Sequence, residues 1–304
     1  MAEVIVYSAN PELALELISA ARLINEQVAA LSINDDELAQ TLSQAGARAI
    51  KITHPDLTMS DTAAVAAAIK QVLDKLQAEV VLLSSDRRGK ELAGRLAQLM
   101  GAGCLTDVAA LEVKGGQIEC RRNALGGATV AVQSIEGPQL IAIRPRSYPA
   151  AEAAAGSLEE MAVDIQASGV KVVDFKAKAG DTVDIEAAEI LVAVGQGLED
   201  EGQLAGVHDL AAKLGGEVAC SKPLATDKKW LSEERIIGLS GKKCKPQLAL
   251  LFGISGQVQF TVGIRDAKVI VAVNTDENAA INYMADYIMQ ADLHQIIQEL
   301  NQKL

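Results

Sequence analysis

Aromatic residues are scarce in this sequence of 304 residues, of which they make up only 3%. Hydrophobic residues nevertheless make up 49% of it, so the core must be built from aliphatic side chains. Short aliphatic strands are typical of parallel β-sheets that are covered by helices. The length is large for one domain and suits two. The composition therefore favours two α/β domains.

Basic residues are fewer than acidic ones: the sequence has 28 Lys and Arg and 40 Asp and Glu, which gives a net charge of −12. A general nucleic-acid-binding surface needs a cationic face, so we expect no nucleic-acid partner. The charge does not exclude a nucleotide cofactor, because backbone N–H groups at the start of a helix can hold phosphate groups.

Long apolar runs and closely spaced cysteines are missing. No uninterrupted apolar run is long enough to cross a bilayer, and the first residues lack the basic and apolar regions of a signal peptide. The four cysteines, Cys104, Cys120, Cys220 and Cys244, are far apart and form no CxxC pair. We expect small buried thiols in the reducing cytoplasm, with no membrane insertion, disulfide framework or zinc site.

Strand and helix patterns alternate four times between residues 4 and 100, which predicts a parallel sheet with helices on both faces. After Asp107, strand-like segments are separated by turn signals such as Gly115-Gly116 and Gly126-Gly127, which predict an appended antiparallel meander. One more strand is expected at Val170–Phe175. The expected fold is α/β, with two doubly wound parallel-sheet domains. We assign residues 1–150 to the N-terminal domain, 151–187 to a linker and 188–304 to the C-terminal domain.

The C-terminal block has four predicted strands, and each one ends in small, polar or glycine residues. In an open α/β sheet, ligands bind outside the carboxyl ends of the strands. Any one such loop is common without a ligand, but four at one sheet edge predict a ligand crevice. The four strand ends are Gly195–Gly197, Ser221-Lys222-Pro223, Gly253–Gly256 and Asn274.

Gly253–Gly256 is the most suggestive of the four, because glycine lets a backbone approach a ligand closely. We expect a helix to follow it, as far as about Gly263, and its N-terminus to receive a pyrophosphate. In the loop Thr226–Pro246, Ser240 and Lys242 are candidate donors to a ring or a phosphate, although a solvated lysine-rich loop is an equally simple interpretation. We expect Trp230 to lie in a core or an interface rather than against a cofactor.

Taken together, these motifs resemble the alpha subunit of electron transfer flavoproteins, most closely the anaerobic branch linked to carnitine metabolism and nitrogen fixation. Arg87-Arg-Gly-Lys-Glu-Leu-Ala93 and Gly126-Gly127 resemble the family's N-terminal domain, so the resemblance covers essentially the whole chain. The C-terminal motifs that carry it are Ala219-Cys-Ser-Lys-Pro-Leu224, Lys229-Trp230, Ile237-Gly-Leu-Ser-Gly241, Leu251-Phe-Gly-Ile-Ser-Gly-Gln-Val-Gln259, Val269-Ile-Val-Ala-Val-Asn-Thr-Asp-Glu-Asn278 and Ala285-Asp-Tyr287.

The resemblance implies a heterodimer with a beta subunit, contacted by the N-terminal domain, and one FAD in the C-terminal domain. It implies an electron carrier rather than an enzyme, with flavin dehydrogenases or NADH as donors and a quinone, ferredoxin or acyl-CoA-linked acceptor. Carried over by position, Ser221 and Lys222 lie at the flavin ring, and Asn274 and Asp292 reach the adenosine end. The remaining implied contacts are Gly238, Leu239, Ser240 and Gly241 at the ring and ribityl chain, and Ser255, Gly256, Gln257 and Gln259 along the ribityl chain and diphosphate.

Three positions depart from the family pattern. Gln196 stands where the family usually has Arg, Lys222 where it has Arg, and Phe260 where it has His. Reduced flavin carries negative charge near its pyrimidine side, which a fixed cation or donor stabilises. Lys222 keeps a charge but lacks the planar guanidinium fork. These changes should lower the flavin potential or weaken FAD binding.

Two alternatives stay open. One is a paralogue that binds little or no FAD and acts as a structural or interaction subunit, which the three departures favour. The other is a subunit of a flavin-bifurcating complex, in which the nicotinamide site lies mostly on the partner. Nothing in the sequence resembles a Ser-His-Asp set or a paired-carboxylate site.

Overall fold

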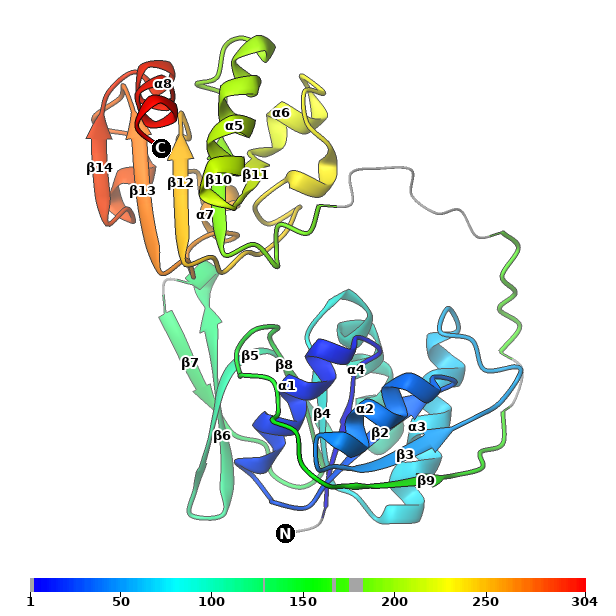
Figure 1. Ribbon diagram of the computed structural model, residues 1–304. Coiled ribbons are helices and arrows are strands. Elements are labelled where there is room, and N and C mark those ends of the chain that lie inside the picture. The colour runs from blue at the N-terminus through cyan, green and yellow to red at the C-terminus, as the bar shows by residue number, and fades with distance from the viewer. Residues whose placement is uncertain (1–2, 128, 166–167, 175–182) are drawn as a thin grey trace. The chain divides into compact units, whose positions relative to one another are not determined.

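The computed structural model describes residues 3–127, 129–165, 168–174 and 183–304. The chain divides into two compact units, Met1–Phe175 and Lys176–Leu304, which we describe separately (Figure 1). The two units confirm the expected α/β fold, because both contain a largely parallel sheet with helices against its faces. None of the helices in these described ranges is long and apolar enough to cross a membrane.

The first unit is built on a nine-stranded sheet in the order β7-β6-β5-β8-β4-β1-β2-β3-β9. All neighbours in it run parallel except β5–β6 and β6–β7, which form the antiparallel part of the expected meander. The fourth strand expected in that meander, at Leu140–Ile143, is wrong in direction, because it lies between β5 and β4 and pairs in parallel with both. The strands are β1 Val4–Tyr7, β2 Val28–Ile33, β3 Arg48–Ile52, β4 Val80–Ser84, β5 Gly103–Lys114, β6 Gln117–Ala124, β7 Thr129–Gln133, β8 Gln139–Ile143 and β9 Ser157–Glu160.

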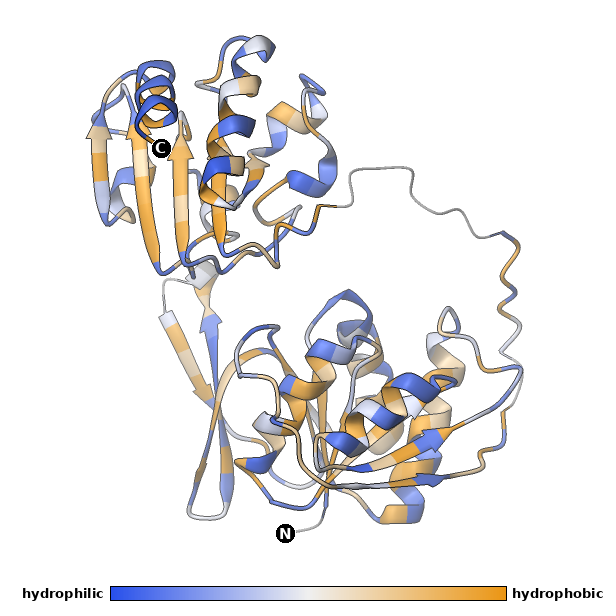
Figure 2. Ribbon diagram, viewed as in Figure 1, coloured by the Kyte–Doolittle hydropathy of each residue, from blue (hydrophilic) through white to orange (hydrophobic). Residues whose placement is uncertain are grey.

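Four helices cover the two faces of this sheet. Helices α1 (Pro11–Arg22) and α2 (Asp36–Gln44) pack on the face that carries Val4 and Val6, and α3 (Thr62–Leu76) and α4 (Arg87–Met100) pack on the face that carries Ile5. Side chains alternate across a strand, so neighbouring residues of β1 enter opposite cores. The aliphatic interior of the strands is visible in Figure 2.

The second unit is built on a five-stranded parallel sheet in the order β11-β10-β12-β13-β14. Helices α5 and α8 pack together against one face, and the segments around α7 and η4 cover the other. The strands are β10 Ile190–Val194, β11 Glu217–Cys220, β12 Leu248–Phe252, β13 Val269–Asn274 and β14 Tyr287–Gln290. The helices are α5 Leu204–Leu214, α6 Lys222–Thr226, α7 Val258–Thr261 and α8 Leu293–Lys303, with 3-10 turns η2 Glu201–Gln203, η3 Glu233–Arg235 and η4 Ala280–Tyr283.

Two expected elements differ in the structure. The strand predicted at Val170–Phe175 is wrong over residues 170–174, and Phe175 lies outside the described residues. Val173 is 95% exposed there, so this valine-rich run has no sheet to pair with or pack on. The helix predicted from Gly256 to Gly263 shrinks to the four residues of α7, followed by turns.

The segment 151–187, assigned to a linker, contains strand β9. This strand pairs in parallel with β3 through Arg48↔Ser157 to Lys51↔Glu160, at the outer edge of the first sheet. Sequence reasoning missed it because a four-residue edge strand with three exposed side chains carries almost no periodicity. The structure divides the chain between Phe175 and Lys176, inside the assigned linker.

Candidate functional site

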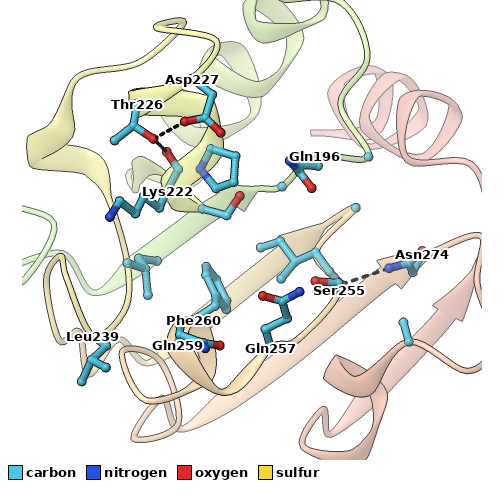
Figure 3. A pocket seen from close by; sticks show the side chains of 18 of the residues that line it. Gln196, Lys222, Thr226, Asp227, Leu239, Ser255, Gln257, Gln259, Phe260 and Asn274 are labelled. Carbon is cyan, nitrogen blue, oxygen red and sulfur yellow. Dashed lines mark hydrogen bonds between the residues drawn. The ribbon is translucent and has the colours of Figure 1, made fainter.

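A cavity of about 700 Å³ lies at the carboxyl edge of the second unit's sheet (Figure 3). Its volume falls in the range of about 300–1,000 Å³ that is usual for small-molecule and cofactor sites. Each of the first four strands of this sheet ends beside it, as the doubly wound fold requires. Ten residues implied by the resemblance line it: Gln196, Ser221, Lys222, Leu239, Ser240, Ser255, Gln257, Gln259, Phe260 and Asn274.

The floor of the cavity is a crossing of two glycine loops, one after β10 and one after β12. The Gly197 amide donates to the Gly253 carbonyl oxygen at 3.0 Å, and the Gly195 amide donates to that of Phe252 at 2.9 Å. A Cβ on Gly197 would lie 2.7 Å from Gly253 Cα, and Gly253 itself has a φ of +60°. Only glycine permits this approach, and the absence of side chains leaves the space above the crossing open.

One wall comes from the end of β11 and the start of α6. The Ser221 amide donates to the Val194 carbonyl oxygen at 3.0 Å, which fixes the start of α6 beside β10. Lys222 follows with an exposed side chain and, among the described residues, forms no ion pair. One turn later, Thr226 Oγ1 lies 2.8 Å from Asp227 Oδ1, and both side chains line the cavity.

A second wall is the tight turn of residues 237–242. The Lys242 amide donates to the Ile236 carbonyl oxygen at 2.7 Å, and the Leu239 amide donates to that of Gln259 at 2.7 Å. The turn thereby presents Leu239 and Ser240 to the cavity, both exposed.

Gly238 and Gly241, which the resemblance places at the ring, do not line the cavity. A Cβ on Gly238 would lie 2.3 Å from the Gln259 carbonyl oxygen, and one on Gly241 would lie 2.2 Å from that of Ile236. These glycines permit the close packing that forms the turn. Lys242 is not a lining residue either, because its Nζ pairs with Glu234 at 3.4 Å.

The third wall is the loop after β12 and the short helix α7. Ser255, Gln257 and Gln259 expose their side chains there, and the amides of residues 255–257 donate no hydrogen bond within the described part of the chain. These amides are free to serve a ligand. Gly256 does not line the cavity: its φ is +84°, and a Cβ on it would lie 2.0 Å from the Ile281 amide nitrogen.

Phe260 is both a lining residue and a core residue. Its side chain is only 7% exposed and belongs to the apolar cluster that contains Ile237, Ile254 and Ile264. The aromatic ring therefore contributes packing to the base of α7, and it offers the cavity no hydrogen-bond donor.

Asn274 and Asp292 mark the far end of the site. Asn274 Nδ2 donates to the Ile254 carbonyl oxygen at 3.0 Å, which ties β13 to the glycine loop. Asp292 does not line the large cavity. It lies in a neighbouring cavity of about 220 Å³ that shares Gly197, Gly253 and Asn274 with the large one, and its Oδ1 accepts from the Gln295 amide at 3.0 Å as the N-cap of α8.

The charges that line the large cavity are sparse. Lys222 is the single cation among its described lining residues, and Asp227 and Asp276 are the carboxylates. Sequence reasoning missed both acids, because neither lies directly at a strand end. Below Ser221, burial raises the pKa of the Cys220 thiol to about 12, so this thiol is neutral at physiological pH.

Trp230 lies where the sequence suggested, away from the cavity lining. Its ring packs against the core cluster of α5 and α8, and Lys228 Nζ lies 4.0 Å from the ring centroid. Lys228 also donates to the Leu198 carbonyl oxygen at 2.9 Å, which links this loop to the glycine loop after β10.

Comparison with known proteins gives this site its chemistry. The model of the electron transfer flavoprotein domain matches residues 8–167, and that of the electron transfer flavoprotein FAD-binding domain matches residues 184–265. The chain belongs to the electron transfer flavoprotein family. The second match covers three of the four strand ends at the cavity, so the FAD-binding domain is the unit that contains it. Members of this family carry electrons and are not self-sufficient enzymes.

Curated relatives match over the whole length of the chain. It is 34% identical over 303 residues to "Putative electron transfer flavoprotein subunit YdiR" of Escherichia coli K12, covering 98% of this chain and 97% of the relative. It is 32% identical over 308 residues to "Protein FixB" of Escherichia coli O157:H7 and of Shigella flexneri, covering 99% of this chain and 98% of each relative. These relatives confirm the resemblance that the motifs indicated.

The cavity fits FAD on three structural observations. Its volume suits a dinucleotide-sized ligand. Its floor is a close backbone crossing of two glycine loops that no Cβ can enter, so no side chain of Gly195, Gly197 or Gly253 occupies the space above it. Its loop after β12 carries three consecutive amides that no described acceptor occupies, next to exposed Ser and Gln side chains suited to hydroxyl and phosphate oxygens.

Proposed function

We propose that this chain is an alpha-type electron-transfer subunit that pairs with a beta subunit and holds FAD in the 700 Å³ cavity. The single observation that carries the proposal is the convergence of four strand ends on one cavity inside the domain matched as FAD-binding. When bound, FAD supplies the redox chemistry, and the protein supplies position and electrostatics. The FAD-free alternative fits this cavity less well.

Within the proposed site, each wall has a separate task. The free amides of Ser255 and Gln257, with the side chains of Gln257 and Gln259, hold the ribityl chain and phosphates, and Asn274 orients the adenosine end. Asp292 reaches the adenosine end through the smaller adjoining cavity. Ser221, Lys222, Leu239 and Ser240 border the flavin ring, with Gln196 and Phe260 beside it.

We further propose that this flavin works at a low potential. Lys222 is the single cation among the described lining residues, and Asp227 lies on the same wall. Phe260 adds apolar surface where a donor would stabilise negative charge, and Gln196 adds no charge. Lys222 alone stabilises the anionic reduced flavin, whereas Asp227 and the apolar ring of Phe260 disfavour it.

Donors and acceptors remain part of the proposal: flavin dehydrogenases or NADH upstream, and a quinone, ferredoxin or acyl-CoA-linked acceptor downstream. We place the protein in the cytoplasm. None of its four cysteines forms a disulfide, which suits a reducing compartment. The expectation of buried thiols is confirmed for Cys120, Cys220 and Cys244 and is wrong for Cys104, which is exposed.

The test is co-expression with its beta subunit, followed by a visible spectrum of the purified heterodimer. A flavin spectrum supports the proposal if each heterodimer contains one FAD that is bound by this chain. Purified heterodimer that is colourless and stays colourless after incubation with FAD overturns it. If the two co-expressed chains do not co-purify in a one-to-one ratio, the proposed heterodimer is overturned.

A further inference from the structure

Arg235 is a buried cation that touches neither the cavity nor any proposed FAD contact. It is 7% exposed, and it belongs to the 3-10 turn η3 that precedes the cavity-lining turn of residues 237–242. A buried guanidinium is costly unless it is paired and hydrogen-bonded, so its place in the fold requires a structural reason.

The reason lies at the outer edge of the sheet. Strand β11 lies at the edge of the sheet, next to β10. The carbonyl groups of Val218 and Cys220 are two residues apart, so both point to the same side of the strand, away from β10. Arg235 Nη1 donates to the Val218 carbonyl oxygen at 2.7 Å, and the Ile237 amide donates to that of Cys220 at 3.0 Å. Glu217 Oε2 lies 3.6 Å from the same Nη1. Together, the side chain and the backbone cover two successive acceptors of the edge.

This pairing sets the position of the cavity wall. Ile237 is joined to Cys220, directly before Ser221, and the turn then crosses to the opposite wall, where the Leu239 amide donates to the Gln259 carbonyl oxygen at 2.7 Å. This second wall of the cavity therefore connects the wall that begins at Ser221 with the wall that contains Gln259. Three residues separate Arg235 from Leu239, the first residue of the turn that lines the cavity.

We propose that Arg235 is a positioning residue that holds the turn of residues 237–242 at the flavin from behind. This inference rests on the proposed placement of FAD in the cavity. Removal of the guanidinium leaves the buried Val218 carbonyl oxygen without this donor, which releases the η3 end of the turn. Leu239 and Ser240 then lose their fixed place beside the ring.

The test compares Arg235→Met and Arg235→Lys with wild type, each as the heterodimer. Arg235→Met should raise the dissociation constant for FAD about tenfold and shift the visible absorption maxima of the bound flavin. Arg235→Lys can donate to the Val218 carbonyl oxygen and should recover part of both effects. The matched control is Lys243→Met, which removes an exposed cation of the same loop and should change neither measurement.

Hydrogen–deuterium exchange of the FAD-free heterodimer provides a readout that does not depend on the flavin. In Arg235→Met, amides of residues 236–242 should exchange at least about tenfold faster, while those of β12 remain protected as in wild type. If Arg235→Met does not fold, FAD affinity and amide exchange are measured on Arg235→Lys, which should show both effects in weaker form. Unchanged exchange and affinity overturn the inference, and so does faster exchange throughout the second unit. If wild type itself binds no FAD, the proposed function fails, and the exchange result still decides the role of Arg235.

Discussion

The two units of this protein use the same parallel architecture and finish their strands in opposite ways. In the first unit, the ends of β1 and β4 carry Ser8 and Ser84, both almost fully buried, whose Oγ atoms lie 3.1 Å apart. Ser84 Oγ is also 3.1 Å from Asp86 Oδ2, and Lys90 pairs with Asp107 at 2.8 Å. These polar groups satisfy one another, so this part of the edge is closed by its own side chains.

In the second unit, the corresponding strand ends carry glycines and exposed side chains. Gly195, Gly197 and Gly253 contact one another through backbone alone, and the amides of residues 255–257 have no described acceptor. The comparison shows that the doubly wound fold supplies the location of a ligand site. The residues that follow each strand decide whether that location is filled by side chains or contains a cavity. The predictions below test this difference, beginning with the largest effect.

The glycine crossing should be the feature least tolerant of change. In Gly197→Ala the new Cβ would lie 2.7 Å from Gly253 Cα, so one of the two loops must shift. Overpacking of this kind costs about 1–3 kcal/mol, which corresponds to about fivefold to 150-fold weaker FAD binding if the whole cost falls on the bound state. The affinity can be measured by titration of the FAD-free heterodimer.

The control for Gly197→Ala lies in the first unit. Gly94 is a helical glycine of α4, and a Cβ on it meets no atom within 4 Å. Gly94→Ala should leave FAD affinity unchanged and stabilise the protein by roughly 0.5–1 kcal/mol. Equal FAD affinity in Gly197→Ala and wild type would show that the crossing does not shape the site.

Phe260→His should raise the flavin potential, because it returns a hydrogen-bond donor to the cavity wall. We expect a rise of about 30 mV, a tenfold change in the equilibrium constant of a two-electron couple. The change also removes an apolar ring that is 7% exposed, so we expect a loss of about 1–3 kcal/mol in stability. Phe260→Leu, which supplies no donor, should leave the potential within error in a reductive titration; an equal rise in both variants would contradict the argument.

Buried thiols should make both units less stable in alkali. Burial raises the pKa of Cys220 to about 12 and that of Cys120, in the first unit, to about 11. Above about pH 9 the unfolded chain loses these protons while the folded chain keeps them, so stability is present below pH 9 and falls as the pH rises toward the folded pKa. Between pH 9 and 10 we expect a loss of about 1 kcal/mol for each thiol.

Urea unfolding at pH 8 and pH 10 measures this loss. Cys220→Ala should lower the pH dependence of the second unit's transition relative to wild type, whatever its effect on absolute stability. Cys104→Ala, which changes a thiol of the first unit, is the control and should leave the pH dependence of the second unit's transition unchanged. Identical pH dependence in wild type and Cys220→Ala would show that this thiol does not contribute.

Lys222→Arg should have the smallest effect, because it exchanges one exposed cation for another. The guanidinium fork offers planar donors to the flavin, and we expect the potential to rise by about 10–20 mV, less than a tenfold change in the two-electron equilibrium. Lys243→Arg makes the same exchange at an exposed site outside the cavity lining and should not move the potential. An unchanged potential in Lys222→Arg would show that the geometry of this charge is irrelevant.

Much of the site was predictable because it depends on local signals. Strands β10, β11 and β12 end directly before the predicted loops at Gly195, Ser221 and Gly253, and β13 ends at Asn274. Because ligands bind at the carboxyl ends of parallel strands, these local signals predict the edge of the sheet where the cavity lies. Ten predicted site residues line it.

What escaped prediction depends on long-range packing. The tasks of Gly238 and Gly241 are set by contacts with Gln259 and Ile236, so a motif that includes them does not reveal that they shape the turn rather than face the ligand. Strand β9 forms because β3 offers it an edge, whereas residues 170–173 form no strand. Arg235 is a charged residue, a type that is mostly exposed, yet its guanidinium donates to an edge carbonyl oxygen in the interior.

The glycine crossing also has a consequence for how this protein can evolve. Every substitution of glycine adds at least a Cβ, and at Gly195, Gly197 and Gly253 that atom would lie less than 3.0 Å from atoms of the opposite loop. A substitution at any one of these glycines therefore strains the opposite loop. A second substitution in the opposite loop cannot relieve this strain, because the glycine there has no side chain to remove. Adaptation of the flavin to new donors and acceptors must proceed through the walls, at positions such as Gln196, Lys222 and Phe260, while the floor stays as it is.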